Sequence, residues 1–168
     1  YFVSHSDPDL AEAVRKGRKA EFAEFHAQGE APDPMAVETL ENSKLQWELK
    51  DKEPHKTLLD YYKNLIQLRK NLPCLSHLER ENVEVSILEK EAVLILKRTY
   101  SDTGCYCLLN FSQEKQHIAF PGKGQKFQKV FDSASPQWKG PAEALPEIRE
   151  DENVIIQAES IIIYSFGV

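Results

Sequence analysis

The spacing of apolar residues changes part-way along the chain from a helical period to a strand period. The most regular helical stretch runs over 54–72, where Leu58, Leu59, Tyr62, Leu65, Ile66 and Leu72 recur at spacings of three and four. Two further helices are predicted to begin at Asp7-Pro8 and at Asp33-Pro34, because an aspartate caps free amides and a proline needs no donor in the first turn. The helix over 54–72 should end before Pro73.

Short strands follow one another in the second half of the chain, with no helix between them. They are predicted over 83–88, 92–98, 105–111, 117–120, 127–131, 154–157 and 161–166. This pattern favours an antiparallel sandwich. The long connection over 132–151 contains Trp138, and loops of that length are often functional. The predicted fold class is therefore α+β, with a helical part over 1–80 and an all-β sandwich domain over 81–168.

Composition narrows the possible partners and compartments. The chain has 168 residues with 21 basic and 27 acidic side chains, a net charge of −6, which argues against nucleic acid as the main partner. No apolar run approaches the length of a membrane-spanning helix, so no membrane association is expected. Three cysteines, an odd number, suit a reducing compartment, and a cytoplasmic location is expected. Cys105 and Cys107 share one face of a predicted strand, as buried hydrophobes rather than a disulfide or a metal pair.

The sequence contains no complete catalytic motif. Gly122 and Gly124 flank a lysine without the helix and hydroxyl that a phosphate-binding loop needs. The five histidines are scattered, and paired carboxylates could meet only if the fold brought them together. Neither a cofactor nor a metal ion is predicted.

The start of the chain carries a family resemblance. Residues 1–23, YFVSHSDPDLAEAVRKGRKAEFA, combine an aromatic pair, a polar stretch with His5, an Asp-Pro-Asp-Leu helix start and a basic segment over 15–19. This run resembles the late catalytic-domain segment of malto-oligosyltrehalose trehalohydrolases, in the alpha-amylase superfamily (glycoside hydrolase family 13). The resemblance continues in Pro32-Asp33-Pro34, in 43–47, where the family usually has Asp in place of Gln46, in 65–69 and, more weakly, in Asn110-Phe111-Ser112.

The resemblance implies a placement within a longer protein. In that family a (β/α)₈ barrel carries the chemistry and an antiparallel sandwich follows it. Residues 1–7 would be the loop after the last barrel strand, and residues 8–72 the final helical part. The catalytic carboxylates of the family lie upstream, so the chain is expected to be a C-terminal fragment with no catalytic residue, inactive alone. The implied parent enzyme hydrolyses the bond between trehalose and a malto-oligosaccharide by retaining chemistry.

Four residues are candidates for substrate binding. Phe2, His5 and Asp7 would face the catalytic cleft of the parent, because sugar rings stack on aromatic side chains and hydroxyls pair with imidazole and carboxylate groups. A helix cap by Asp7 and ordinary packing of Phe2 are the alternatives. Trp138 is predicted to be an exposed sugar platform, or else to pin the long loop to the sandwich. Trp47 is predicted to be a buried anchor between helices, with an exposed sugar platform as the alternative.

Other functions remain open at this point. The chain could be a carbohydrate-binding module, or the corresponding part of a glucan-branching enzyme or an alpha-amylase. It could also be an interaction domain without a sugar role. The expected partner is a malto-oligosaccharide-type substrate bound through the parent barrel. Self-association through an exposed apolar helical face is a further expectation.

Overall fold

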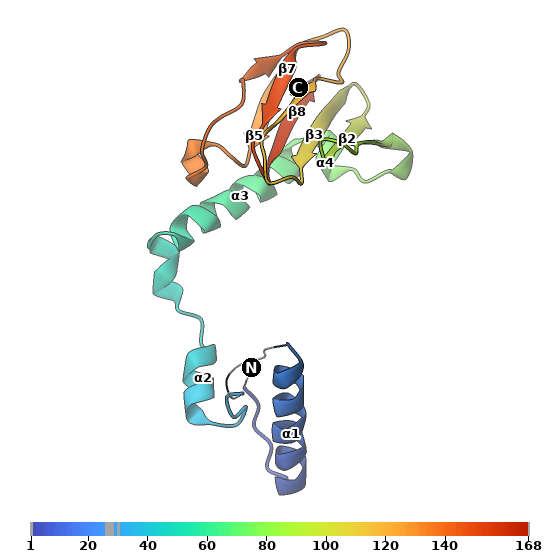
Figure 1. The fold of residues 1–168 in the computed structure, drawn as a ribbon. Helices are drawn as coiled ribbons and strands as arrows, with labels where there is room; N and C mark the ends of the chain where they lie inside the picture. Colours follow the sequence, from blue (N-terminus) through green and yellow to red (C-terminus); the bar gives the residue numbers. More distant parts are fainter. Residues whose placement is uncertain (1, 26–28, 30, 168) are drawn as a thin grey trace. The chain divides into compact units, whose positions relative to one another are not determined.

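The computed structural model describes residues 2–25, 29 and 31–167, which form two compact units, Tyr1–Leu49 and Lys50–Val168 (Figure 1). Tyr1, part of the predicted aromatic pair, lies outside the described residues. The predicted domain boundary at residue 80 stays a prediction. In this chain, residues 50–80 belong to the same compact unit as the sheet.

The first unit contains helices α1 (Pro8–Phe25) and α2 (Val37–Ser43). Asp7 caps α1, since its Oδ1 accepts the backbone N–H of Asp9 at 2.9 Å and that of Leu10 at 3.2 Å. The short helix begins at Val37 rather than at Pro34, because Asp33 first closes a turn by accepting the N–H of Met35.

Polar contacts connect the two helical segments of this unit. The Nε atom of Arg15 lies 3.0 Å from the carboxylate of Asp33, and the hydroxyl of Thr39 donates to the carbonyl of Asp33 at 2.6 Å. In α1 only Ala11 is buried. Trp47, in the short 3₁₀ helix η1 (Trp47–Asp51), is 70% exposed, so the prediction of a buried anchor is wrong.

The second unit contains two further α-helices, two 3₁₀ helices and eight strands. The helices are α3 (His55–Asn71), α4 (Pro73–Ser76), η2 (Arg80–Asn82) and η3 (Pro136–Trp138). The strands are β1 (Val83–Leu88), β2 (Val93–Tyr100), β3 (Thr103–Asn110), β4 (Gln116–Ala119), β5 (Phe127–Asp132), β6 (Glu147–Ile148), β7 (Asn153–Ile156) and β8 (Ile161–Phe166). All seven predicted strands are present, and β6 was not predicted. The predicted α+β fold class, helices followed by an antiparallel β domain, is confirmed.

Six strands form one antiparallel sheet in the order β1-β2-β3-β8-β5-β6, and β4 pairs with β7. The sheet and the β4–β7 pair share one apolar core, and β3 and β8 contribute Leu108 and Ile162, which face each other in register. The other core members are Val93, Ile95, Tyr106, Ile118, Phe120, Phe127, Ile148, Val154, Ile156 and Tyr164. The two layers account for the predicted sandwich.

The opposite face of the large sheet is covered by α3 and α4. Here Cys105 and Cys107 of β3 and Ile163 of β8 pack with Leu72 and Cys74, and the α3 side chains Tyr61, Leu65 and Leu68 border this second cluster. Because side chains alternate along a strand, β3 and β8 are buried on both faces. The helices therefore complete the core of the sheet.

A core truncation in β3 tests this arrangement. Leu108→Ala should lower the free energy of unfolding by about 2–5 kcal/mol in urea titrations, because the side chain is fully buried between the layers. Leu78→Ala is the matched control, since Leu78 is 57% exposed, and it should change stability by about 0.5 kcal/mol or less. Equal effects of the two substitutions would contradict the assignment of the core.

Candidate functional site

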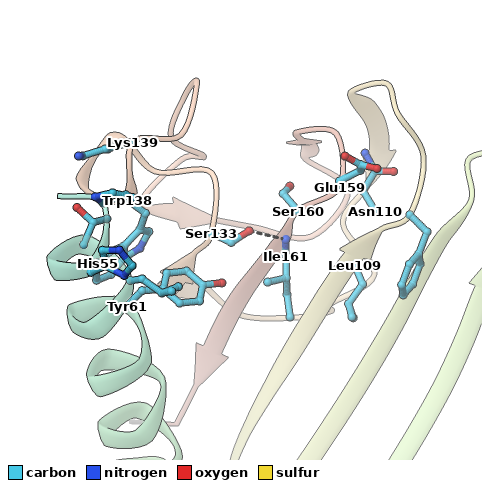
Figure 2. A pocket seen from close by; sticks show the side chains of 14 residues that line it. His55, Tyr61, Leu109, Asn110, Ser133, Trp138, Lys139, Glu159, Ser160 and Ile161 are labelled. Carbon is cyan, nitrogen blue, oxygen red and sulfur yellow. Dashed lines mark hydrogen bonds between the residues drawn. The ribbon is translucent and has the colours of Figure 1, made fainter. Parts of the chain in front are cut away.

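A cavity of about 950 Å³ lies between the N-terminal part of α3 and the sheet (Figure 2). We call it the α3 pocket. Four segments line it, with the residues Pro54, His55, Thr57, Leu58, Tyr61, Leu109, Asn110, Phe111, Ser133, Trp138, Lys139, Glu159, Ser160 and Ile161. Its volume and its mixture of apolar walls with a few polar groups are typical of small-molecule sites.

Two aromatic rings form the wall on the helix side of the pocket. Trp138 packs edge-to-face on Tyr61, with ring centroids 5.3 Å apart, and both rings contact Phe131 of the second core cluster. The indole Nε1 of Trp138 is buried and has no hydrogen-bond partner among the described residues. Trp138 is partly buried and pins its loop to the sheet, which was the alternative to an exposed platform. Its contact with sugar stays a prediction.

Several polar groups of the pocket keep unused hydrogen-bonding capacity. Within the described parts of the chain, the carboxylate of Glu159 and the imidazole of His55 have neither a hydrogen bond nor an ion pair. The Oγ atom of Ser133 accepts the N–H of Ile161 at 2.9 Å, which leaves its proton free to donate (Figure 2). Burial raises the pKa of the Tyr61 phenol, so this hydroxyl stays a neutral donor at physiological pH.

Other polar groups of the lining are already engaged. Lys139 is paired with the carboxylate of Glu53 at 2.7 Å, and this hydrogen bond, helped by that from Thr57, holds the pKa of Glu53 below its usual value. The side chain of Asn110 donates to the carbonyls of Glu114 and Gln157 at 2.7 and 2.8 Å. Asn110 therefore fixes turns, and its part of the Asn-Phe-Ser motif is structural.

The α3 pocket has the groups for binding but not for glycoside cleavage. Its lining contains one carboxylate, Glu159, whereas glycoside hydrolysis uses two carboxyl groups across the scissile bond. In the described portion of the chain, no three His, Cys, Asp or Glu side chains lie close enough to hold a metal ion. No helix there is long and apolar enough to cross a membrane.

The residues predicted from sequence fall in both units. Phe2 and His5 are partly buried in the first unit, and Asp7 caps α1 there, as its alternative role required. Of the four residues predicted to bind substrate, only Trp138 lines the α3 pocket. Sugar binding by the first three residues stays a prediction. Sequence reasoning missed Tyr61 and Glu159 as pocket residues, because they lie about 100 positions apart and no motif connects them.

The three cysteines lie together in the second core cluster. Cys74, Cys105 and Cys107 are all free and buried, which confirms that Cys105 and Cys107 serve as buried hydrophobes. A hydrogen bond with the thiol of Cys107, together with burial, raises the pKa of Cys105 to about 12. A buried thiol that resists ionisation is a poor nucleophile.

Comparison with solved structures identifies the class of protein. A putative alpha amylase from Salmonella typhimurium matches 97% of this chain with a TM-score of 0.67 and 25% identity, and the match covers 24% of that chain. An alpha-amylase from H. orenii shares the fold over 82% of this chain, with a TM-score of 0.53 and 19% identity. The chain is therefore similar to part of enzymes of the alpha-amylase family. No family model matches it.

Comparison with curated sequences gives a narrower relationship. The malto-oligosyltrehalose trehalohydrolase of Arthrobacter ramosus is 43% identical over 74 residues, covering 44% of this chain and 13% of the relative. That of Deinococcus radiodurans is 34% identical over 122 residues, which covers 71% of this chain and 20% of the relative. That of Saccharolobus solfataricus is 31% identical over 124 residues, which covers 73% of this chain and 18% of the relative. The matches thus span a fifth or less of these relatives, and the resemblance predicted from the sequence is confirmed.

Thiol labelling tests the structural assignment of the cysteines. In the folded protein all three thiols should react with Ellman's reagent roughly 100-fold or more slowly than in denaturant, because each lies in the core. A Leu78→Cys variant supplies an exposed thiol as the control and should gain one fast-reacting group. Fast labelling of a native cysteine in the folded chain would show that this cluster is accessible.

Proposed function

We propose that this chain is the C-terminal part of a glycoside hydrolase that releases trehalose from malto-oligosyl trehalose. In this proposal a (β/α)₈ barrel outside the chain carries the bond-breaking carboxylates, and the chain supports that barrel. The observation that carries the proposal is a second apolar face of α3. One face of the helix packs against the sheet, and the adjoining face carries exposed apolar side chains.

Beside the sheet-packed face of α3 runs a stripe of three large apolar side chains. Leu58, Tyr62 and Ile66 are 54%, 58% and 51% exposed and lie four residues apart, so they follow one line along the helix. We call them the outer stripe. An apolar surface wider than the sheet covers is typical of a helix that packs on more than one neighbour within a larger protein. The outer stripe therefore calls for a further layer of protein.

The comparisons indicate which layer that would be. This chain matches nearly its whole length to about a quarter of an alpha-amylase-family structure, and its curated relatives are five or more times longer than the matched region. The helices of a (β/α)₈ barrel pack on the strands that they surround. If α3 is the last barrel helix, strands of the barrel cover Tyr62 and Ile66 of the outer stripe, while Leu58 lines the α3 pocket and α3 also holds the sheet.

The names of the relatives support the choice of reaction. The sequence relatives described above are named malto-oligosyltrehalose trehalohydrolase, which favours trehalose release over the activity of an alpha-amylase or a glucan-branching enzyme. Such hydrolysis needs two carboxyl groups held about the scissile bond. The α3 pocket offers one, so the isolated chain should be inactive. Three free thiols agree with the predicted cytoplasmic location.

An activity assay tests whether the catalytic groups lie outside this chain. The isolated chain should release no trehalose from malto-oligosyl trehalose above a buffer blank, measured by chromatography of the products. The longer protein that contains the chain should release trehalose. Turnover by the isolated chain would overturn the scaffold role, and formation of branched glucan by the longer protein would favour the alternative enzyme.

A substitution in the outer stripe tests the support role. Tyr62→Glu should destabilise the longer protein by about 3 kcal/mol or more, because a charge would replace a buried aromatic ring. In the isolated chain the same change should alter stability by about 0.5 kcal/mol or less, since Tyr62 is exposed there. Both are measured by thermal or urea unfolding.

The matched control for Tyr62→Glu is Asn64→Glu, an exposed polar position on the same helix. It should be nearly neutral in both proteins. Equal loss of stability for the two variants in the longer protein would contradict burial of the outer stripe. Sedimentation of the isolated chain addresses the predicted self-association, which Tyr62→Glu should weaken if the stripe mediates it.

A further inference from the structure

We propose that the α3 pocket binds a short α-1,4-linked glucan. The class of ligand rests on the proposed function, whereas the place and the contact groups come from the pocket itself. Nothing in the names of the relatives assigns a ligand to this part of the chain.

The walls of the pocket match the two kinds of surface on a glucose unit. A pyranose ring presents apolar C–H faces together with a rim of hydroxyls. Trp138 and Tyr61 provide aromatic surface on the helix side (Figure 2). Phe111, which follows β3 and is 65% exposed, adds a third aromatic ring to the lining. The volume of about 950 Å³ lies near the upper end of the range for small-ligand pockets, so an oligosaccharide segment can be accommodated.

The unused polar groups match the hydroxyls. Glu159 is an acceptor without a partner among the described residues, while Tyr61 and Ser133 keep hydroxyl protons to donate. In Figure 2 the Tyr61 hydroxyl points away from α3 toward the strand side of the pocket, where Ser160 and Ile161 lie. A sugar is both donor and acceptor at each hydroxyl, so it can pair with all three groups.

Other ligand classes fit the pocket less well. Lys139 is neutralised by Glu53, and the remaining carboxylate of Glu159 would repel a phosphate or a carboxylate. A purely apolar ligand would cover Glu159 and the Tyr61 hydroxyl without pairing them, at a cost of about 1–3 kcal/mol for each group. A neutral polyhydroxylated ligand avoids both penalties.

The position of the pocket agrees with a role in handling substrate. The pocket lies at the N-terminal end of α3. In a (β/α)₈ barrel each helix follows the C-terminal end of a strand, and substrates bind at that end of the barrel. If α3 is a barrel helix, a glucan held in the pocket lies on the side of the parent enzyme that receives substrate.

Fluorescence of Trp138 tests the proposal directly. The chain has two tryptophans, so Trp47→Phe leaves Trp138 as the single reporter. Titration of this variant with maltotetraose should give a saturable change in emission, and cellotetraose, with the same glucose units in β-linkage, should give a much weaker one. Glu159→Gln in the same background should raise the dissociation constant roughly tenfold, because a charged acceptor is lost.

Two controls separate binding in the pocket from other effects. Glu89→Gln changes an exposed acid in the turn between β1 and β2 and should leave the dissociation constant unchanged. Circular dichroism should show that each variant is folded. Absence of a saturable change with maltotetraose, or equal effects of Glu159→Gln and Glu89→Gln, would overturn the proposal.

The proposed function and the pocket can fail separately. If the longer protein releases trehalose but Trp138 does not respond to maltotetraose, the pocket proposal is wrong and the function stands. If Trp138 responds as expected but the longer protein has no such activity, the pocket binds glucan and the proposed reaction is wrong.

Discussion

The packing of α3 and α4 on one face of the six-stranded sheet is the interaction on which the rest of this structure depends. The central strands β3 and β8 carry apolar side chains on both faces, and the β4–β7 pair covers only one of them. Without the helices, Cys105, Cys107 and Ile163 would face water. At about 25 cal/mol per Å² of apolar surface, leaving that face uncovered would cost a large part of the stability of a small domain. The sheet and the end of the helical half therefore fold as one unit.

That constraint fixes the orientation of α3 and explains its second apolar face. Once Tyr61, Leu65 and Leu68 are turned toward the sheet, the helical period places Leu58, Tyr62 and Ile66 on a separate line. A solvent-facing line would be expected to carry charged and polar side chains, as at Lys63 and Asn64. The helix thus carries apolar side chains on two adjoining faces, and the support role proposed above rests on this geometry rather than on any catalytic group.

The sequence predicted most of the elements, because strand alternation and turn residues are local signals. It missed β6, which has only two residues, and it predicted a buried Trp47 where the structure exposes that ring. It also merged the two faces of α3 into one stripe that included Tyr62 and omitted Tyr61. Spacings of three and four do not distinguish one wide apolar face from two adjacent ones, and only the position of the sheet settles which tyrosine is packed.

The candidate site was predictable only in part, because four distant segments build it. Trp138 stood out in the sequence as a large aromatic residue in a long loop. Only the fold brings Tyr61, Ser133 and Glu159 together in the pocket, so the sequence alone did not mark them as site residues. Asn110 shows the reverse situation: it belongs to the Asn-Phe-Ser motif on which part of the predicted resemblance rested, yet its side chain holds the turns at the ends of β3 and β7. The amide also orients Ser112, whose carbonyl accepts the N–H of Glu159. The motif therefore has a structural role. By holding these turns it also positions one wall of the pocket in which binding is proposed.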